Sequence, residues 1–328
     1  MTKLAAATAA LSLVLVCPSL AAPQEPSSQP VKPTFRSAVD LVSVAAVVRD
    51  KRGRFARDLK KEDFVVEEGG ARRDIIDFHS DSNAPIRVAL LFDVSGSMRM
   101  SSRLEQARQA ARHVLSSLRF SGGEPAAGSP STRDEAAVFS FDMNLQSLQP
   151  FTADASAIEQ ALGRVKPYGQ TSLYDAIAHT SREVGTTRGA DRHRRAVIVF
   201  TDGMDTSSLL KPEQVAAIAS GIDVPVYVMT VTSNLVTSSA EHDREGALEE
   251  TPLQSLTRWT GGTLFVTSAP AHESVAARQI VDELRHQYVI AFGASASAGW
   301  RPLSVKTKDR DLSVRARSGY AAGTKAGS

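Results

Sequence analysis

The sequence predicts an α/β protein: a doubly wound, mainly parallel sheet with a small flanking β-domain built from the N- and C-terminal segments. From about residue 84 to residue 287, short apolar runs alternate with amphipathic helical segments, and strands separated by helices pair in parallel through right-handed crossovers. Outside that range, short alternating runs and turn signals occur without a helical period. The composition, 42% hydrophobic and 23% charged, is that of a globular protein.

The first 21 residues have the features of a signal peptide. Lys3 gives a positive start, residues 4–16 are apolar, and Ser19-Leu20-Ala21 fits a cleavage site. The apolar run is short for a membrane span. Cleavage would remove Cys17, the only cysteine, so the mature chain would have no disulfide. Val16 is too bulky for the position before a lipidated cysteine, so we expect soluble export to the periplasm or the cell exterior.

The remaining chain divides by composition. Residues 50–53 and 68–70 supply turns between strands in the N-terminal β segment, and strands are also expected over 288–292, 302–307 and 312–317. Whether the two β segments pair with each other is left open by the sequence. The expected layout is a signal peptide (1–21), a disordered lead-in (22–36), an N-terminal β segment (37–83), an α/β domain (84–287), a C-terminal β segment (288–321) and a tail (322–328).

Within the α/β domain, apolar spacing distinguishes helices from strands. The run from Ala196 to Phe200 is apolar throughout and predicts a central, buried strand. Residues 121–133 are rich in Gly, Pro and Ser and predict a surface loop. Helices are expected over 103–118, 154–165, 172–184, 211–220, 252–260 and 274–287, and strands over 86–94, 135–141, 145–151, 194–201, 224–231 and 262–266.

Oxygen-bearing side chains follow two of these strands and precede one of the helices. Asp93, Ser95 and Ser97 come directly after a buried strand, Asp202 follows the central strand, and Thr171 precedes a helix. In an open parallel sheet the carboxyl ends of the strands carry the ligand-binding loops, so these side chains are expected at one edge. Hydroxyl and carboxylate oxygens suit a hard divalent cation. A single such loop more often caps a helix or forms a turn, but three in this order favour a cation site.

The pattern Asp-x-Ser-x-Ser, a later Thr before a helix and Thr-Asp-Gly after a central strand resembles the von Willebrand factor type A (VWFA) domain with its metal-ion-dependent adhesion site (MIDAS). The resemblance covers about 84–290 and implies a Rossmann-like fold. "LKKEDFVVEEGG" and "VRARSGYAAG" in the flanks are similar to the bacterial exported VWFA-related family. Gln170 stands where many relatives have glycine, which removes no ligand. The resemblance implies Mg²⁺, with Mn²⁺ or Ca²⁺ as alternatives, held by Asp93, Ser95, Ser97, Thr171 and Asp202.

In the family's ligand-ready state the two aspartates act largely through water, so the ion stays electrophilic and takes a carboxylate from another protein. The resemblance therefore implies a non-enzymatic, exported, adhesion-type module whose partner is a protein supplying an Asp or Glu. The chain has 38 Lys and Arg residues against 36 Asp and Glu residues, so its net charge is too small to attract nucleic acid. No membrane span is expected in the mature chain.

Two other functions remain open at this point. The same ion could activate water in a metal-assisted hydrolase, or the site could be vestigial in a structural scaffold. The sequence contains no phosphate-binding loop, dinucleotide fingerprint or His-Glu-x-x-His helix. We expect His113 and His179 to be packing or surface residues, Asp205 to form a turn, and the basic run 188–195 to be a solvated loop.

Overall fold

The computed structural model describes residues 41–120, 133–166, 169–185, 193–231, 250–267, 269–295 and 298–322. The predicted signal peptide, the lead-in and most of the predicted 121–133 loop lie outside these residues. No helix in the described ranges combines the length and the apolar character needed to cross a bilayer.

A mainly parallel sheet forms the centre of the α/β part, as predicted. Its strand order is β10-β9-β8-β5-β6-β7, and all neighbours run parallel except β7, which forms an antiparallel hairpin with β6. The strands are β5 (Ile86–Asp93), β6 (Glu135–Phe141), β7 (Leu145–Thr152), β8 (Arg194–Thr201), β9 (Val226–Val231) and β10 (Leu264–Thr267). The helices are α1 (Arg103–Ser116), α2 (Ala155–Arg164), α3 (Leu173–Gly185), α4 (Pro212–Gly221), α5 (Pro252–Thr260) and α6 (Pro270–Arg285).

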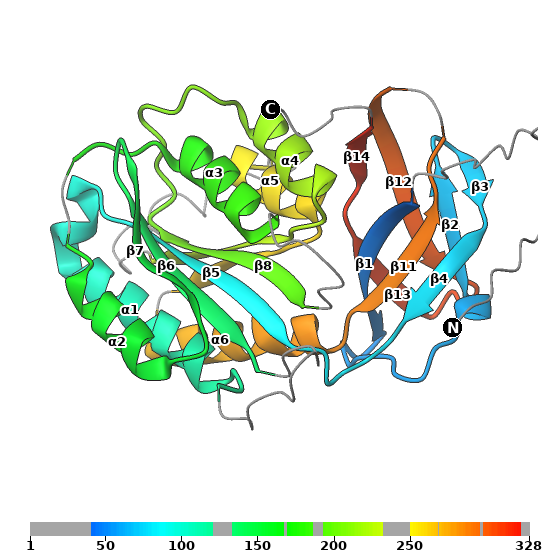
Figure 1. Cartoon of the computed structure of the whole chain (residues 1–328), viewed down its shortest axis with the longest axis horizontal. Coiled ribbons are helices and arrows are strands. Elements are labelled where there is room, and N and C mark those ends of the chain that lie inside the picture. The colour runs from blue at the N-terminus through cyan, green and yellow to red at the C-terminus, as the bar shows by residue number, and fades with distance from the viewer. Residues whose placement is uncertain are drawn as a thin grey trace, which may run out of the picture. The chain divides into compact units, whose positions relative to one another are not determined.

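Helices cover both faces of this sheet (Figure 1). Along β5, Val88, Leu90 and Phe92 point into one apolar cluster with residues of α1, α2 and α6. Ala89 and Leu91 point into a second cluster with residues of α3, α4 and α5. Because successive side chains of a strand alternate between faces, a strand buried on both faces is apolar at nearly every position. The unbroken apolar runs of β5 and β8 follow from this.

The two β segments pair in one sandwich, which settles what the sequence left open. One sheet has the order β13-β1-β11-β4 and the other β14-β12-β2-β3, and Phe64, Val66, Ile290 and Phe292 lie in the core between them. The strands are β1 (Leu41–Asp50), β2 (Phe64–Glu68), β3 (Ala71–Arg73), β4 (Ile75–His79), β11 (Tyr288–Gly293), β12 (Gly299–Thr307), β13 (Leu312–Ala316) and β14 (Gly319–Ala322).

A buried ion-pair cluster joins this sandwich to the α/β part. Glu283 of α6 is fully buried and pairs with Arg49 of β1 at 3.0 Å and with Arg315 of β13. The carboxylate thus neutralises cations from two strands of the sandwich. The Ser318 backbone N–H also donates to the Trp259 carbonyl at 3.1 Å.

Three details differ from the sequence predictions. Helix α6 starts four residues earlier than predicted, at Pro270, which occupies the first helical turn where its missing N–H costs nothing. Strand β14 was not predicted, because Gly-Tyr-Ala-Ala shows little alternation. Arg194 begins β8, as the predicted strand over 194–201 requires, but it is only 5% exposed, so the expectation of a solvated basic run over 188–195 is wrong for this residue.

Candidate metal site

The first loop of the candidate site follows β5 at the carboxyl end of the sheet. Asp93 is the last residue of the strand and is fully buried. Its Oδ1 accepts a hydrogen bond from the Ser95 backbone N–H at 2.8 Å, which turns the chain into a 3-10 helix, Gly96–Ser102. The Ser95 and Ser97 hydroxyl oxygens lie 3.0 Å apart. The alternating Asp-x-Ser-x-Ser spacing therefore gathers these polar side chains on one side of the turn.

The loop after β8 is tied directly to the first loop. Thr201, the last residue of β8, donates from its hydroxyl to Asp93 Oδ2 at 2.7 Å. The same hydroxyl oxygen accepts from the Gly203 N–H at 3.0 Å, which bends the chain just after Asp202. The side chain of Asp202 is 6% exposed, and its Oδ2 accepts from Arg103 Nη1 of α1 at 2.9 Å. Adjacent parallel strands β5 and β8 thus place both predicted acidic ligands at the same edge.

The third loop places Thr171, which is 3% exposed, two residues before the start of α3. The Gly96 N–H donates to the Gly169 carbonyl at 3.0 Å, which joins this loop to the first. The Thr171 carbonyl accepts from the Thr206 N–H at 2.9 Å, which joins it to the loop after β8. The backbone of Thr171 is therefore held between the other two loops.

Several residues that the sequence did not single out as supports hold these loops in place. Gly169 has φ +94°, and a Cβ there would lie 3.0 Å from the Asp142 side chain, so only glycine fits without displacement. The Asp142 carbonyl accepts from the Ser172 N–H at 2.8 Å. Asp205, predicted to form a turn, accepts from the Leu173 N–H at 2.9 Å and from the Ser208 hydroxyl, so it satisfies a donor in the first turn of α3.

The electrostatics of Asp93 follow from its position. Burial raises the pKa of its carboxyl, and the charge of Asp202 acts in the same direction. Hydrogen bonds from Ser95 and Thr201 oppose the rise. Two carboxylates close enough to affect each other, with limited water, favour the binding of a cation between or beside them.

The donor set fits a hard divalent ion. All five predicted ligands offer oxygen, and the 3.0 Å separation of the two serine hydroxyls is close to the distance of about 2.9 Å between neighbouring ligands in an octahedral Mg²⁺ shell. Among the described residues, no three His, Cys, Asp or Glu side chains form a cluster that could hold a metal. The predicted set contains only two such residues, so hydroxyls would have to complete it.

Comparison with solved structures found chains that are similar to parts of this one. The conserved hypothetical protein BatB from Bacteroides thetaiotaomicron is 20% identical, with 60% of this chain and 98% of that chain covered and a TM-score of 0.46. A von Willebrand factor type A protein from Catenulispora acidiphila is 14% identical, with 82% and 76% covered and a TM-score of 0.48. Proximal thread matrix protein 1 from the mussel byssus, in a form with a zinc-occupied MIDAS motif, is 16% identical, with 66% and 49% covered and a TM-score of 0.44.

No curated protein sequence matches the chain. A family model does match it: residues 88–204 fit the model described as the von Willebrand factor type A domain. This range runs from β5 through the first residues after β8 and includes all five predicted ligands. Residues 88–204 therefore match the von Willebrand factor type A domain.

Proposed function

We propose that this protein is an exported, divalent-metal-dependent protein-binding module. Asp93, Ser95, Ser97, Thr171 and Asp202 would hold the ion, with Mg²⁺ as the expected metal and Mn²⁺ or Ca²⁺ as alternatives. A partner protein would supply an Asp or Glu carboxylate. The match to the von Willebrand factor type A domain over 88–204 supports this class of function.

One observation carries the proposal: the Ser95 and Ser97 hydroxyls lie 3.0 Å apart beside the buried Asp93 carboxylate. Hydroxyls near a carboxylate at the carboxyl edge of a parallel sheet supply oxygen donors without adding charge. A bound dication would supply a strong electrophilic centre for an incoming anion. Neutral serine and threonine ligands leave most of the charge of such an ion available to a partner carboxylate.

The chain's own residues would determine how the partner approaches. Asp93 is fully buried and fixed by Ser95 and Thr201, so it orients the turn rather than meeting the partner. Ser97 is partly exposed, and Met100 and Met204 beside the two loops are 61% and 62% exposed. Exposed methionines form adaptable apolar contacts at binding surfaces. A partner with an acidic residue flanked by apolar side chains fits this edge.

Affinity capture tests the proposal. The full mature chain is immobilised and exposed to a native extract with Mg²⁺ or with a chelator, alongside Asp202→Asn and a control, Asp311→Asn, at an exposed position in the sandwich. We expect one protein to be retained only with metal, by the wild type and by Asp311→Asn. Substituting its contacting Asp or Glu with alanine should abolish retention. Retention that ignores both chelator and Asp202→Asn would contradict the proposal.

Export is proposed from the sequence of the first 21 residues. Sequencing the N-terminus of the protein from the cells that make it should find a chain beginning just after Ala21, outside the cytoplasm. An uncleaved chain in the cytoplasm would contradict export but would leave metal-dependent binding to be judged on its own experiment.

A further inference from the structure

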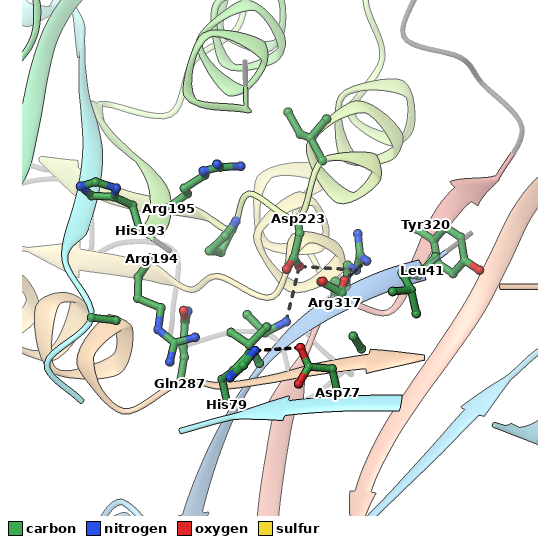
Figure 2. A pocket seen from close by; sticks show the side chains of 18 of the residues that line it. Leu41, Asp77, His79, His193, Arg194, Arg195, Asp223, Gln287, Arg317 and Tyr320 are labelled. Carbon is green, nitrogen blue, oxygen red and sulfur yellow. Dashed lines mark hydrogen bonds and ion pairs between the residues drawn. The ribbon is translucent and has the colours of Figure 1, made fainter. Parts of the chain in front are cut away.

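We propose that a second site, a pocket between the β-sandwich and the amino ends of the parallel strands, binds a small anion through the guanidinium groups of Arg194 and Arg317. The pocket has a volume of about 600 Å³, a size typical of small-molecule sites. It is lined by residues of β1, β4 and β11 from the sandwich and by the start of β8 and the segment after α4 from the α/β part (Figure 2). The site is independent of the proposed metal function.

Arg317 lies between β13 and β14 and is 4% exposed. One of its nitrogens, Nη2, donates to the Ser43 carbonyl. Its Nε lies 3.6 Å from Asp223 Oδ1, too far for a hydrogen bond. Both Nε and Nη1 are buried, and neither has a hydrogen-bond partner among the residues that the structure describes. A buried guanidinium with two unsatisfied donors is costly unless an acceptor reaches it.

Arg194 shows the same feature on the opposite wall. It is 5% exposed at the start of β8, and its Nη2 donates to the Asp81 carbonyl at 3.4 Å. Its Nε is buried and has no hydrogen-bond partner within the described part of the chain. Figure 2 shows its guanidinium beside Gln287, on the side of the pocket away from Tyr320. Burial lowers the pKa of both arginines, which reflects the same loss of solvation.

The two buried guanidinium groups favour an anion over a neutral ligand. They face the pocket, whose lining also holds the carboxylates of Asp81 and of Asp223, which lies 3.6 Å from Arg317. Asp77 is paired with His79 at 2.8 Å. The planar guanidinium matches the paired oxygens of a carboxylate or a phosphate. An anion would therefore supply acceptors to guanidinium groups whose donors are only partly satisfied by the described residues.

The walls favour an anion that carries an apolar body. The lining includes aliphatic side chains from both parts of the chain, and Tyr320. These are Leu41, Val42, Ala45, Ile222, Pro225 and Val289. An organic acid or a phosphorylated small molecule would bury its apolar part against them and direct its oxygens to the arginines.

The pocket is separate from the candidate metal site. Arg194 is the first residue of β8, whereas Thr201 and Asp202 follow at the opposite end of the same strand. Eight residues of extended strand span roughly 26 Å. Substitutions in the pocket can therefore be made without touching any of the five predicted metal ligands.

Titration calorimetry on the full mature chain tests the site with three probes: benzoate, the neutral isostere benzamide, and inorganic phosphate. We expect saturable binding of benzoate or phosphate and none of benzamide. Arg194→Gln should weaken that binding about tenfold or more, because a charge-assisted hydrogen bond is lost. Arg72→Gln, at an exposed position on β3, should leave it unchanged. Preference for benzoate would identify an organic acid, and preference for phosphate a phosphorylated ligand.

A second variant, which keeps every charge, distinguishes a loss of binding from a loss of folding. Ala45→Leu on β1 would fill part of the pocket, so it should abolish benzoate binding while the melting temperature of the free protein stays near that of the wild type. The absence of saturable binding by both anions would overturn the proposal. So would binding that Arg194→Gln and Ala45→Leu both leave intact, or benzamide binding as tight as benzoate binding.

Discussion

Arg103 Nη1 donates to Asp202 Oδ2 at 2.9 Å, so a positive charge already lies against one of the five predicted metal ligands. The two side chains are 16% and 6% exposed, and water therefore screens their interaction only partly. A dication entering the site would meet repulsion from Arg103 and would compete with it for the same carboxylate. This residue gives the site an internal cation that was not evident from the sequence.

Arg103→Gln is expected to tighten Mn²⁺ binding about fivefold, equivalent to about 1 kcal/mol, because it removes a nearby like charge. The glutamine amide can still donate to Asp202. Metal titration in calorimetry measures the change, with Arg112→Gln on the outer part of α1 as the control. Weaker binding in Arg103→Gln would show instead that the guanidinium positions Asp202 for the metal.

Ser97→Ala is expected to weaken Mn²⁺ binding about tenfold, since it removes one neutral oxygen ligand. Ser97 is partly exposed and its hydroxyl contacts Ser95, so the melting temperature in the presence of chelator should change little. Ser116→Ala, at the exposed end of α1, is the matched control. Equal metal affinity in Ser97→Ala and the wild type would remove Ser97 from the ligand set.

Glu68 in the sandwich predicts a pH dependence of stability. Burial acts to raise the pKa of its carboxyl, but hydrogen bonds from the Tyr320 hydroxyl and the Ser295 backbone, together with Arg73 at 2.6 Å, outweigh it and lower the pKa. A lowered folded-state pKa contributes stability that is present above the unfolded value of 4.5 and is lost as the pH falls through the folded value. Glu68→Gln should therefore lower the melting temperature at pH 7.

This effect should shrink as the pH falls below the unfolded value of 4.5 and through the lowered folded value, where the wild-type carboxyl also becomes protonated. Thermal unfolding of the two proteins between pH 3 and pH 7 measures it. A constant difference in melting temperature across that range would mean that the charge of Glu68 does not contribute to stability.

Glu283→Gln tests the buried ion-pair cluster that joins the sandwich to the α/β part. The substitution leaves the guanidinium groups of Arg49 and Arg315 without their buried counter-charge, and breaking such a pair costs about 3 kcal/mol or more. Chemical denaturation measures the free energy of unfolding. Glu67→Gln, which removes an exposed pair with Lys306, should cost less than about 1 kcal/mol. Equal effects of the two substitutions would contradict a stabilising role for the buried cluster.

The sequence predicted the α/β part well because its signals are local. The continuous apolar runs of β5 and β8 arise from burial on both faces of the sheet, and Asp154 caps α2 by accepting from Ser156 and Ala157, as its position before an apolar periodic segment suggests. The carboxyl ends of parallel strands lie at one edge of a sheet, so the meeting of the three polar loops at that edge could also be inferred.

The pairing of the β segments and the contacts of the arginines could not be inferred in this way. Strand β1 pairs with β11, more than 200 residues away, and no local pattern encodes that choice. Arg194 belongs to a basic run typical of a solvated loop, yet the sandwich buries it. Arg103 is the first residue of α1, and nothing in its sequence neighbourhood indicates that its side chain reaches Asp202. These relationships depend on tertiary packing.

Crystals soaked in Mn²⁺ and measured at the manganese absorption edge test the central claim most directly. The predicted result is a single anomalous peak within about 2.3 Å of the Ser95 and Ser97 hydroxyl oxygens, with Thr171, Asp93 and Asp202 bound directly or through water. It should disappear in Asp202→Asn crystals or lose most of its height. No peak among these three loops at saturating Mn²⁺, with the five side chains turned apart, would contradict the account.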